Sequence, residues 1–256
     1  MKKLLITFAI FVVLVSGACG KEMEQKKAQV EKAGKVANLA TKSFLPSPYV
    51  GKIRPLRCLS NSLILVQFNG LNFGKSKSAE ELEFMARMFR DADLIVIEEV
   101  STDGTGARAI SQLADYLNRT GNKWLYSDSD STHQSSKKEK YGYLWNDSRI
   151  HAVREKPTLI SSLSGVLMRE PAKMTFIFNG KSFDVFSFHL VPTKDKPINE
   201  VVALSRNPEI FSANNVFVVG DFNLDHQKMK NVFEDRLGFR HQIEGRTSLK
   251  KSVVEG

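Results

Sequence analysis

The stretch that decides the fold is Asn-Val-Phe-Val-Val-Gly-Asp-Phe-Asn-Leu-Asp, residues 215–225. Its β-branched and aromatic run, Val216 to Val219, lacks polar alternation, which predicts a strand covered on both faces. Gly220 follows where the backbone must turn, so Asp221 and Asn223 are expected at the mouth of this strand. A carboxylate and an amide two residues apart can reach one phosphate, one water or one hard cation. The same pair also suits an Asx turn that closes a hairpin.

Other apolar strands are also predicted to end in polar side chains. The strands are 63–68, 93–100 and 183–188, and the polar residues at their ends are Asn69, Glu98 with Glu99, and His189. Strand ends are where sites are assembled on rigid scaffolds. Because side chains alternate along a strand, at most one of Glu98 and Glu99 is expected to face such a site. Both could also be solvated charges at its rim.

The segments between these strands predict helices and a hairpin. Residues 78–90 begin with Ser78 and Glu81 at capping-box spacing and carry apolar residues at helical intervals. Residues 106–120 form a second amphipathic pattern, which indicates a helix that covers a sheet. Asn179-Gly180 joins two apolar runs and is a strong hairpin signal.

The chain begins with a targeting pattern. Lys2 and Lys3 precede an apolar run, and Ser16-Gly17-Ala18 provides small residues before Cys19. Residues 1–18 are therefore predicted to be a signal peptide, and the protein is expected to be exported. Gly-Ala-Cys is similar to a bacterial lipoprotein cleavage site, so we expect Cys19 to be lipidated and to anchor the protein to a membrane. Simple cleavage after Ala18, giving a periplasmic or secreted protein, is the alternative.

Composition then divides the remaining chain. Residues 19–45 are rich in Lys, Glu, Gln and Ala and are predicted to be a tether, while residues 46–256 suit one domain. If Cys19 carries lipid, Cys58 has no partner within the chain; if it does not, a disulfide between them is conceivable. The net charge of +9 falls to +7 without Lys2 and Lys3. A basic surface favours polyanionic partners, or serves only solubility.

Six ordered motifs together resemble the endonuclease/exonuclease/phosphatase superfamily, and their order and spacing are most similar to deoxyribonuclease I-like nucleases. They are Phe-Asn-Gly-Leu-Asn-Phe-Gly (68–74), Val-Ile-Glu-Glu-Val (96–100), Lys-Glu-Lys-Tyr-Gly-Tyr (138–143), Arg-Glu-Pro-Ala (169–172), Ser-Phe-His-Leu (187–190) and Gly-Asp-Phe-Asn (220–223). The resemblance implies an α+β fold, a four-layer αββα sandwich of two packed β-sheets with outer helices.

The resemblance also implies catalytic roles. His189 resembles the family's catalytic histidine, and Glu139 resembles the carboxylate that orients it. Arg169 resembles the arginine that faces the scissile phosphate. Asp221 and Asn223 resemble the pair that orients the nucleophile. Phosphodiester cleavage needs such groups, because an attacking water, a developing charge and a leaving oxygen must all be served.

Two further residues resemble the family's metal site. These are Asn69 and Glu99, and Glu99 is preferred over Glu98 because the family glutamate directly precedes the aliphatic residue. The implied cofactor is Mg²⁺, with Mn²⁺ or Ca²⁺ as alternatives. Magnesium keeps several waters, so one carboxylate and one amide suffice beside a substrate phosphate.

The resemblance ends before the chain does. Family members close with a further strand and an Asp-His pair, whereas residues 248–256 carry neither, so the domain is expected to be C-terminally truncated and its activity impaired. The expected function is an exported Mg²⁺-dependent nuclease acting on nucleic acid, DNA rather than RNA, with no protein partner. The alternatives are a non-catalytic polyanion-binding lipoprotein and a phosphodiesterase or phosphatase acting on lipid or inositol phosphates.

Overall fold

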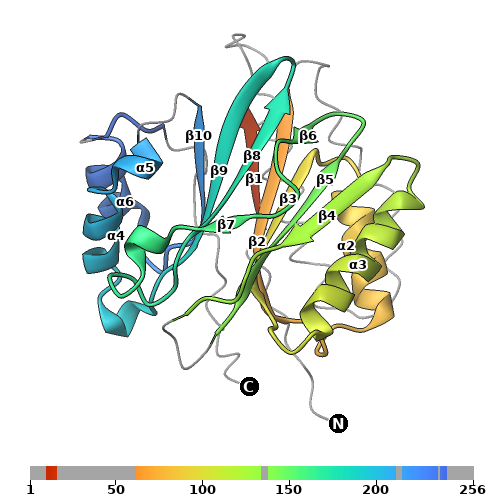
Figure 1. The fold of residues 1–256 in the computed structure, drawn as a ribbon, viewed down its shortest axis with the longest axis horizontal. Coiled ribbons are helices and arrows are strands. Elements are labelled where there is room, and N and C mark those ends of the chain that lie inside the picture. Colours follow the sequence, from red (N-terminus) through yellow and green to blue (C-terminus); the bar gives the residue numbers. More distant parts are fainter. Residues whose placement is uncertain (1–9, 16–61, 134–137, 212–214, 236, 241–256) are drawn as a thin grey trace, which may run out of the picture.

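The computed structural model describes residues 10–15, 62–133, 138–211, 215–235 and 237–240, and the elements lie in four layers (Figure 1). Two β-sheets pack face to face in the middle. Helices cover the outer face of each sheet. The predicted αββα sandwich is therefore confirmed.

The first sheet has the strand order β1-β2-β3-β5-β4. Its strands are β1 (Ile10–Val15), β2 (Leu63–Phe73), β3 (Leu94–Val100), β4 (Trp124–Asp128) and β5 (Lys140–Asn146). Strands β2 and β3 run parallel, whereas the other neighbours are antiparallel. The strand predicted at 63–68 is longer, because the turn-forming residues 69–73 stay within β2 as an irregular stretch where its register with β3 shifts.

The second sheet has the order β10-β9-β8-β6, with β7 also pairing with β8. Its strands are β6 (His151–Ala152), β7 (Thr158–Leu159), β8 (Ala172–Phe178), β9 (Lys181–His189) and β10 (Val216–Asp221). Strands β8 and β9 form the predicted hairpin, in which Asn179 and Gly180 both have positive φ. Strand β10 pairs in parallel with β9.

Five helices are described, and the first of them is capped as its sequence predicts. They are α2 (Ala79–Phe89), α3 (Thr105–Asn118), α4 (Ile198–Leu204), α5 (Pro208–Phe211) and α6 (His226–Phe233), with short 3₁₀ turns at η2 (Ser161–Leu163) and η3 (Thr193–Asp195). Ser78 and Glu81 form the predicted capping box at the start of α2. Among the described residues, no helix is long and apolar enough to span a membrane.

Three apolar clusters hold the four layers together. The first lies between α2, α3 and the first sheet, the second lies between the two sheets, and the third lies between the second sheet and α4–α6. Strand β10 contributes to two of them, since Phe217 and Val219 face the second cluster, and Val216 and Val218 face the third. Both faces of β10 are thus packed, but Val216 to Val218 are only half-buried because β10 is an edge strand of the described sheet.

The N-terminal predictions lie largely outside the described residues. Cys19, the tether at 19–45 and Cys58 fall in undescribed segments, as do residues 241–256. Within the predicted signal peptide, Ile10–Val15 forms β1 and pairs antiparallel with β2.

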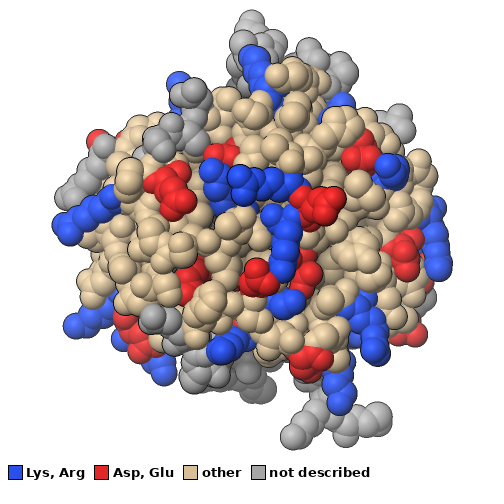
Figure 2. All heavy atoms as spheres, viewed as in Figure 1, with Lys and Arg blue, Asp and Glu red and all other residues tan. Residues whose placement is uncertain are grey.

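Charge is mixed on the face drawn in Figure 2. Lys and Arg side chains gather near the centre of this view, with Asp and Glu side chains beside them. Among the described residues several basic groups are paired with carboxylates, for example Lys140 with Asp128 and Lys156 with Asp130. The positive net charge therefore does not make this face uniformly basic.

Candidate active site

Two parallel strand pairs deliver the predicted site residues to one end of the sandwich. Strands β2 and β3 carry Asn69 and Glu99 near their carboxyl ends. Strands β9 and β10 end at His189 and Asp221, which are paired positions in the parallel register. Asn69 Nδ2 lies 3.4 Å from Asp221 Oδ2. The ends of the two sheets therefore meet, and residues 152 positions apart in the chain are brought together.

His189 is held by a buried carboxylate. Its Nδ1 lies 2.9 Å from both Oε1 and Oε2 of Glu139, and both side chains are about 7% exposed. Because a carboxylate accepts, Nδ1 carries the proton, and Nε2 is left to exchange a proton with another group. That nitrogen lies 3.8 Å from Glu99 Oε1. The structure thus places the predicted Glu139–His189 pair in contact and points its reactive nitrogen toward Glu99.

Arg169 supports this pair rather than standing open to a ligand. Its Nε lies 3.0 Å from Glu139 Oε2 in an ion pair whose N–H is not aligned for a hydrogen bond, and its Nη1 donates to the His189 carbonyl at 3.3 Å. The side chain is only 7% exposed. The sequence resemblance implied a guanidinium facing the scissile phosphate; in the structure, burial and the charge of Glu139 direct it inward.

Glu99 and Asn69 form the half-exposed part of the site. Glu99 Oε1 accepts from Asn69 Nδ2 at 2.8 Å, and Glu99 Oε2 accepts from the Asn72 N–H at 3.1 Å. Asn69 Oδ1 in turn accepts from the Leu71 N–H. In this arrangement the amide of Asn69 orients Glu99, and its own oxygen would face an ion only after the amide turned over.

The backbone around the site adopts conformations that non-glycine residues rarely take. Leu71, Asn72, Glu99 and Asn223 all have positive φ, from 47° to 57°. Such residues cost about 1–3 kcal/mol each and cluster at functional sites. At Glu99 the conformation also breaks the alternation of β3, whose register with β5 shifts between Ile97 and Val100.

The spacing of Asp221 and Asn223 suits either a binding site or an Asx turn, and the structure shows features of both. Asp221 Oδ1 accepts from the Asn223 N–H at 3.1 Å, which is an Asx turn. This turn leads into α6 rather than closing a hairpin. Asp221 Oδ2 meanwhile faces Asn69, whereas Asn223 Nδ2 donates to the Leu190 carbonyl. Asp221 therefore lies in the site, while the amide nitrogen of Asn223 is occupied in fixing the turn.

Sequence reasoning set Glu98 aside, yet the structure buries it completely beneath this cluster. Glu98 Oε1 accepts from Gln67 Nε2 at 2.8 Å, and both of its oxygens accept from the Asp221 N–H. Burial, followed by the nearby charges of Asp221 and Glu139, raises the pKa of the Glu98 carboxyl well above its usual value. Its position inside an apolar strand could have signalled burial, but the distorted β3 backbone is what lets both glutamates approach the site.

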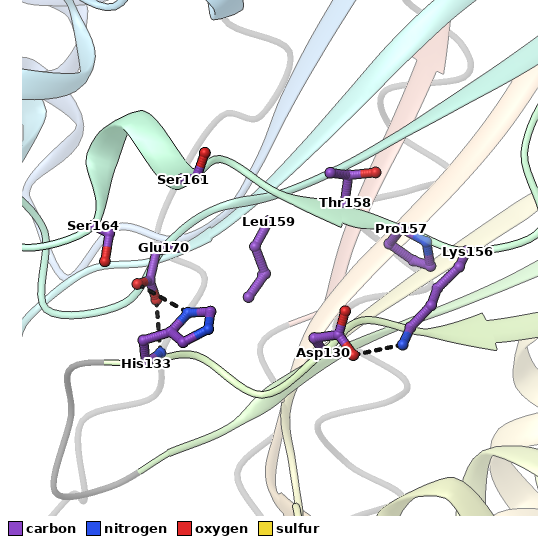
Figure 3. A pocket seen from close by; sticks show the side chains of 9 residues that line it. All are labelled: Asp130, His133, Lys156, Pro157, Thr158, Leu159, Ser161, Ser164 and Glu170. Atoms are coloured by element: carbon purple, nitrogen blue, oxygen red, sulfur yellow. Dashed lines mark hydrogen bonds and ion pairs between the residues drawn. The ribbon is translucent and has the colours of Figure 1, made fainter.

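Beside this centre, Glu170 faces a separate hollow of about 610 Å³ (Figure 3). Glu170 accepts from the His133 N–H at 2.9 Å, and the His133 ring lies 3.3 Å away. On the other side of the hollow Asp130 pairs with Lys156. Burial opposes ionisation of Glu170, but hydrogen bonds from His133 and Ser164 outweigh it, so its pKa is lowered. Glu170 thus holds the backbone of His133 in place.

The donor set at the centre suits a hard cation. Glu99 and Asp221 offer carboxylate oxygens at a half-exposed position, and oxygen donors are those that Mg²⁺ prefers. Within the described residues, no three His, Cys, Asp or Glu side chains form a cage for a metal ion. Magnesium keeps several waters when bound, so the two carboxylates that are present would suffice as its protein ligands.

No protein-family model and no curated protein matches this chain. Among solved structures, it is similar to D. rerio TDP2 humanized by 14 mutations, with 15% identity, 66% of this chain and 70% of that chain covered, and a TM-score of 0.47. It is also similar to an endonuclease/exonuclease/phosphatase family protein from Leptotrichia buccalis, with 15% identity, coverages of 66% and 73%, and a TM-score of 0.45.

A third similar structure is sphingomyelinase C from Streptomyces griseocarneus, with 12% identity, coverages of 65% and 68%, and a TM-score of 0.42. The family named for the Leptotrichia protein is the one that the six sequence motifs resemble. At these identities and TM-scores, the likeness adds no argument about activity.

Proposed function

We propose that this chain is a metal-dependent phosphodiester hydrolase of the endonuclease/exonuclease/phosphatase type, acting as a deoxyribonuclease I-like nuclease. The observation that carries the proposal is the buried Glu139–His189 pair, whose free Nε2 points at the half-exposed carboxylate of Glu99. A histidine fixed in one tautomer beside a cation-binding carboxylate is suited to move a proton to or from an oxygen of a phosphodiester.

The chain's own groups divide this work. Glu139 fixes the orientation and tautomer of the imidazole, and Arg169 in turn holds Glu139. Asp221 faces the same centre and can accept a hydrogen bond from an attacking water. Glu99, with Asp221 and the Asn69 amide beside it, would hold Mg²⁺. When bound, this ion would neutralise charge on the phosphate oxygens.

The decisive experiment compares two histidine variants that each lose a glutamate partner. His189→Ala should lower the rate of Mg²⁺-dependent plasmid cleavage by about 10² to 10⁴, the usual contribution of a proton-transfer group. His133→Ala is the control, because its exposed ring pairs with Glu170 outside the proposed centre. Equal rates for His189→Ala and the unchanged protein would remove His189 from the reaction.

A nucleic-acid substrate is proposed from the net charge and from the sequence resemblance. Binding to duplex DNA should weaken steeply with added salt, because Lys and Arg groups that contact phosphates release counterions. Vesicles containing sphingomyelin or phosphoinositides serve as the competing substrates in the same assay. Cleavage of these lipids, together with DNA affinity that does not change with salt, would favour a lipid phosphodiesterase instead.

Export and anchoring are proposed from the first 19 residues alone. A basic start, an apolar run and Gly-Ala-Cys favour cleavage before Cys19 and lipidation of this residue. Such cleavage would remove β1 and leave β2 at the edge of the first sheet. The nuclease would then act at a membrane surface, on substrate outside the cytoplasm.

A further inference from the structure

A buried carboxyl group links the two sheets directly beneath the site. Glu98 belongs to β3 of the first sheet, whereas Asp221 ends β10 of the second. The Asp221 N–H donates to Glu98 Oε1 at 3.1 Å and to Oε2 at 3.0 Å. Glu98 has no exposed surface, so water does not compete for this contact.

The contact fixes the backbone of Asp221 on both sides. Its carbonyl accepts from the Leu190 N–H of the neighbouring chain segment at 3.0 Å, and its N–H is held by Glu98. With both backbone groups held, the direction of the Asp221 carboxylate is set. Because β10 is an edge strand in the described sheet, no strand on its outer side could supply this restraint.

Glu98 is itself held in place from β2. Gln67 is 1% exposed and donates from Nε2 to Glu98 Oε1 at 2.8 Å. The oxygen of the same amide, Gln67 Oε1, has no hydrogen-bond partner among the described residues. Gln67 can therefore both donate to and accept from a side chain at position 98. A side chain there with one donor and one acceptor would be fully hydrogen-bonded to Gln67 and would still accept from the Asp221 N–H.

We propose that Glu98 is a positioning residue that holds Asp221, and through it the catalytic groups of the second sheet, in register with Asn69 and Glu99 of the first sheet. The part of this inference that concerns catalysis rests on the proposed hydrolase function. The part that concerns the contact does not. A glutamine at position 98 should replace the glutamate, whereas a side chain of similar length without an acceptor should not.

The contact is tested by hydrogen exchange at the Asp221 amide, which requires no activity. In Glu98→Met the exchange rate should rise about tenfold relative to the unchanged protein, because the N–H loses its acceptor. In Glu98→Gln the change should stay within about threefold. Asp93→Leu is the matched control. Asp93 is also buried, accepts from the Ile64 N–H and pairs with Arg149, but it directly precedes β3 and so lies at the end of the strand remote from the site.

The catalytic role is tested with the same variants. Glu98→Met should lower kcat for phosphodiester cleavage by about 10- to 100-fold with KM changed by less than about threefold, the usual cost of losing an outer-shell partner. Glu98→Gln and Asp93→Leu should both keep the kcat of the unchanged protein. A purely structural role would instead lower the melting temperature in Glu98→Met and Asp93→Leu alike and leave kcat of the folded fraction unchanged.

The outcomes separate this inference from the proposed function. If neither the unchanged protein nor any variant cleaves a phosphodiester, the proposed function fails. Hydrogen exchange at the Asp221 amide still tests whether Glu98 holds Asp221. Unchanged exchange in folded Glu98→Met would overturn the inference, as would a full kcat. Should that variant not fold, Gln67→Met, which frees Glu98 from one side, should raise the Asp221 exchange rate about threefold, and no change there would also overturn it.

Discussion

Replacing Gly220 with alanine should disrupt the second sheet and the site together. Gly220 has φ of 152°, a conformation that residues with a side chain rarely adopt. A Cβ built there would lie 2.0 Å from the Phe188 carbonyl oxygen and 2.8 Å from its carbon. These are backbone atoms of the paired position in β9, so no side chain can rotate away to relieve the contact.

The magnitude follows from that overlap. Real Cβ atoms essentially never approach another heavy atom within 3.0 Å, so the strands must separate by about 1 Å at this position. Such a shift breaks one or two ladder hydrogen bonds, at about 1 kcal/mol each, and the backbone conformation adds about 1–3 kcal/mol. The total loss of about 2–5 kcal/mol is substantial against the 5–15 kcal/mol that stabilises a typical domain.

Urea unfolding of Gly220→Ala measures the loss of free energy, and Gly180→Ala provides the control. Gly180 also has positive φ, 74°, but a Cβ there would meet nothing within 4 Å. It should cost only about 1–2 kcal/mol and leave phosphodiester cleavage unchanged. Because His189 and Asp221 directly follow the clash, the folded fraction of Gly220→Ala should also cleave at least about tenfold more slowly. Equal free energies for the two variants would refute the steric argument.

Three further predictions concern Glu98, Glu99 and Cys19. As pH rises above about 4.5, Glu98→Gln should become more stable than the unchanged protein, and the ratio of their folding equilibrium constants should rise by up to about tenfold per pH unit. The reason is that the pKa of Glu98 is raised in the folded state, so the folded protein resists the ionisation that the unfolded chain undergoes. Parallel curves of unfolding free energy against pH for the two proteins would contradict this. Glu99→Gln should weaken Mg²⁺ binding in calorimetric titration far more than Glu98→Gln, since only Glu99 is half-exposed; equal losses would remove Glu99 as the ligand. Cys19→Ser should release the protein from the membrane fraction of a bacterial host, and an unchanged protein found wholly in the soluble fraction would exclude the lipid anchor.

Much of the fold could be predicted because its signals are local. The capping box at Ser78, the Asn179-Gly180 turn and the apolar run before Gly220 each specify their own structure over a few residues. Strand β4 escaped prediction because Leu125 and Tyr126 are exposed, and its short sequence lacks a regular apolar pattern.

The site was predicted as a set of residues but not as an arrangement. Alternation along β3 was expected to place Glu98 and Glu99 on opposite faces, with at most one serving the site. The positive φ of Glu99 breaks that alternation, and both carboxyl groups contact the site residues. The inward direction of Arg169 likewise depends on Glu139, which lies 30 positions away in sequence. Such facts depend on tertiary contacts, which local spacing does not encode.

Because the site is divided between two sheets, the rate of catalysis depends on the relative position of the two sheets. Asn69 and Glu99 belong to one sheet, and Glu139 directly precedes β5 of that sheet, whereas His189 and Asp221 belong to the other. The sheets meet mainly through apolar side chains, which resist separation but tolerate sliding better than directional bonds do. A shear of one sheet over the other by a single ångström would leave every helix and strand intact and still misalign the reacting groups. On heating, cleavage should therefore fail at a lower temperature than the secondary structure melts.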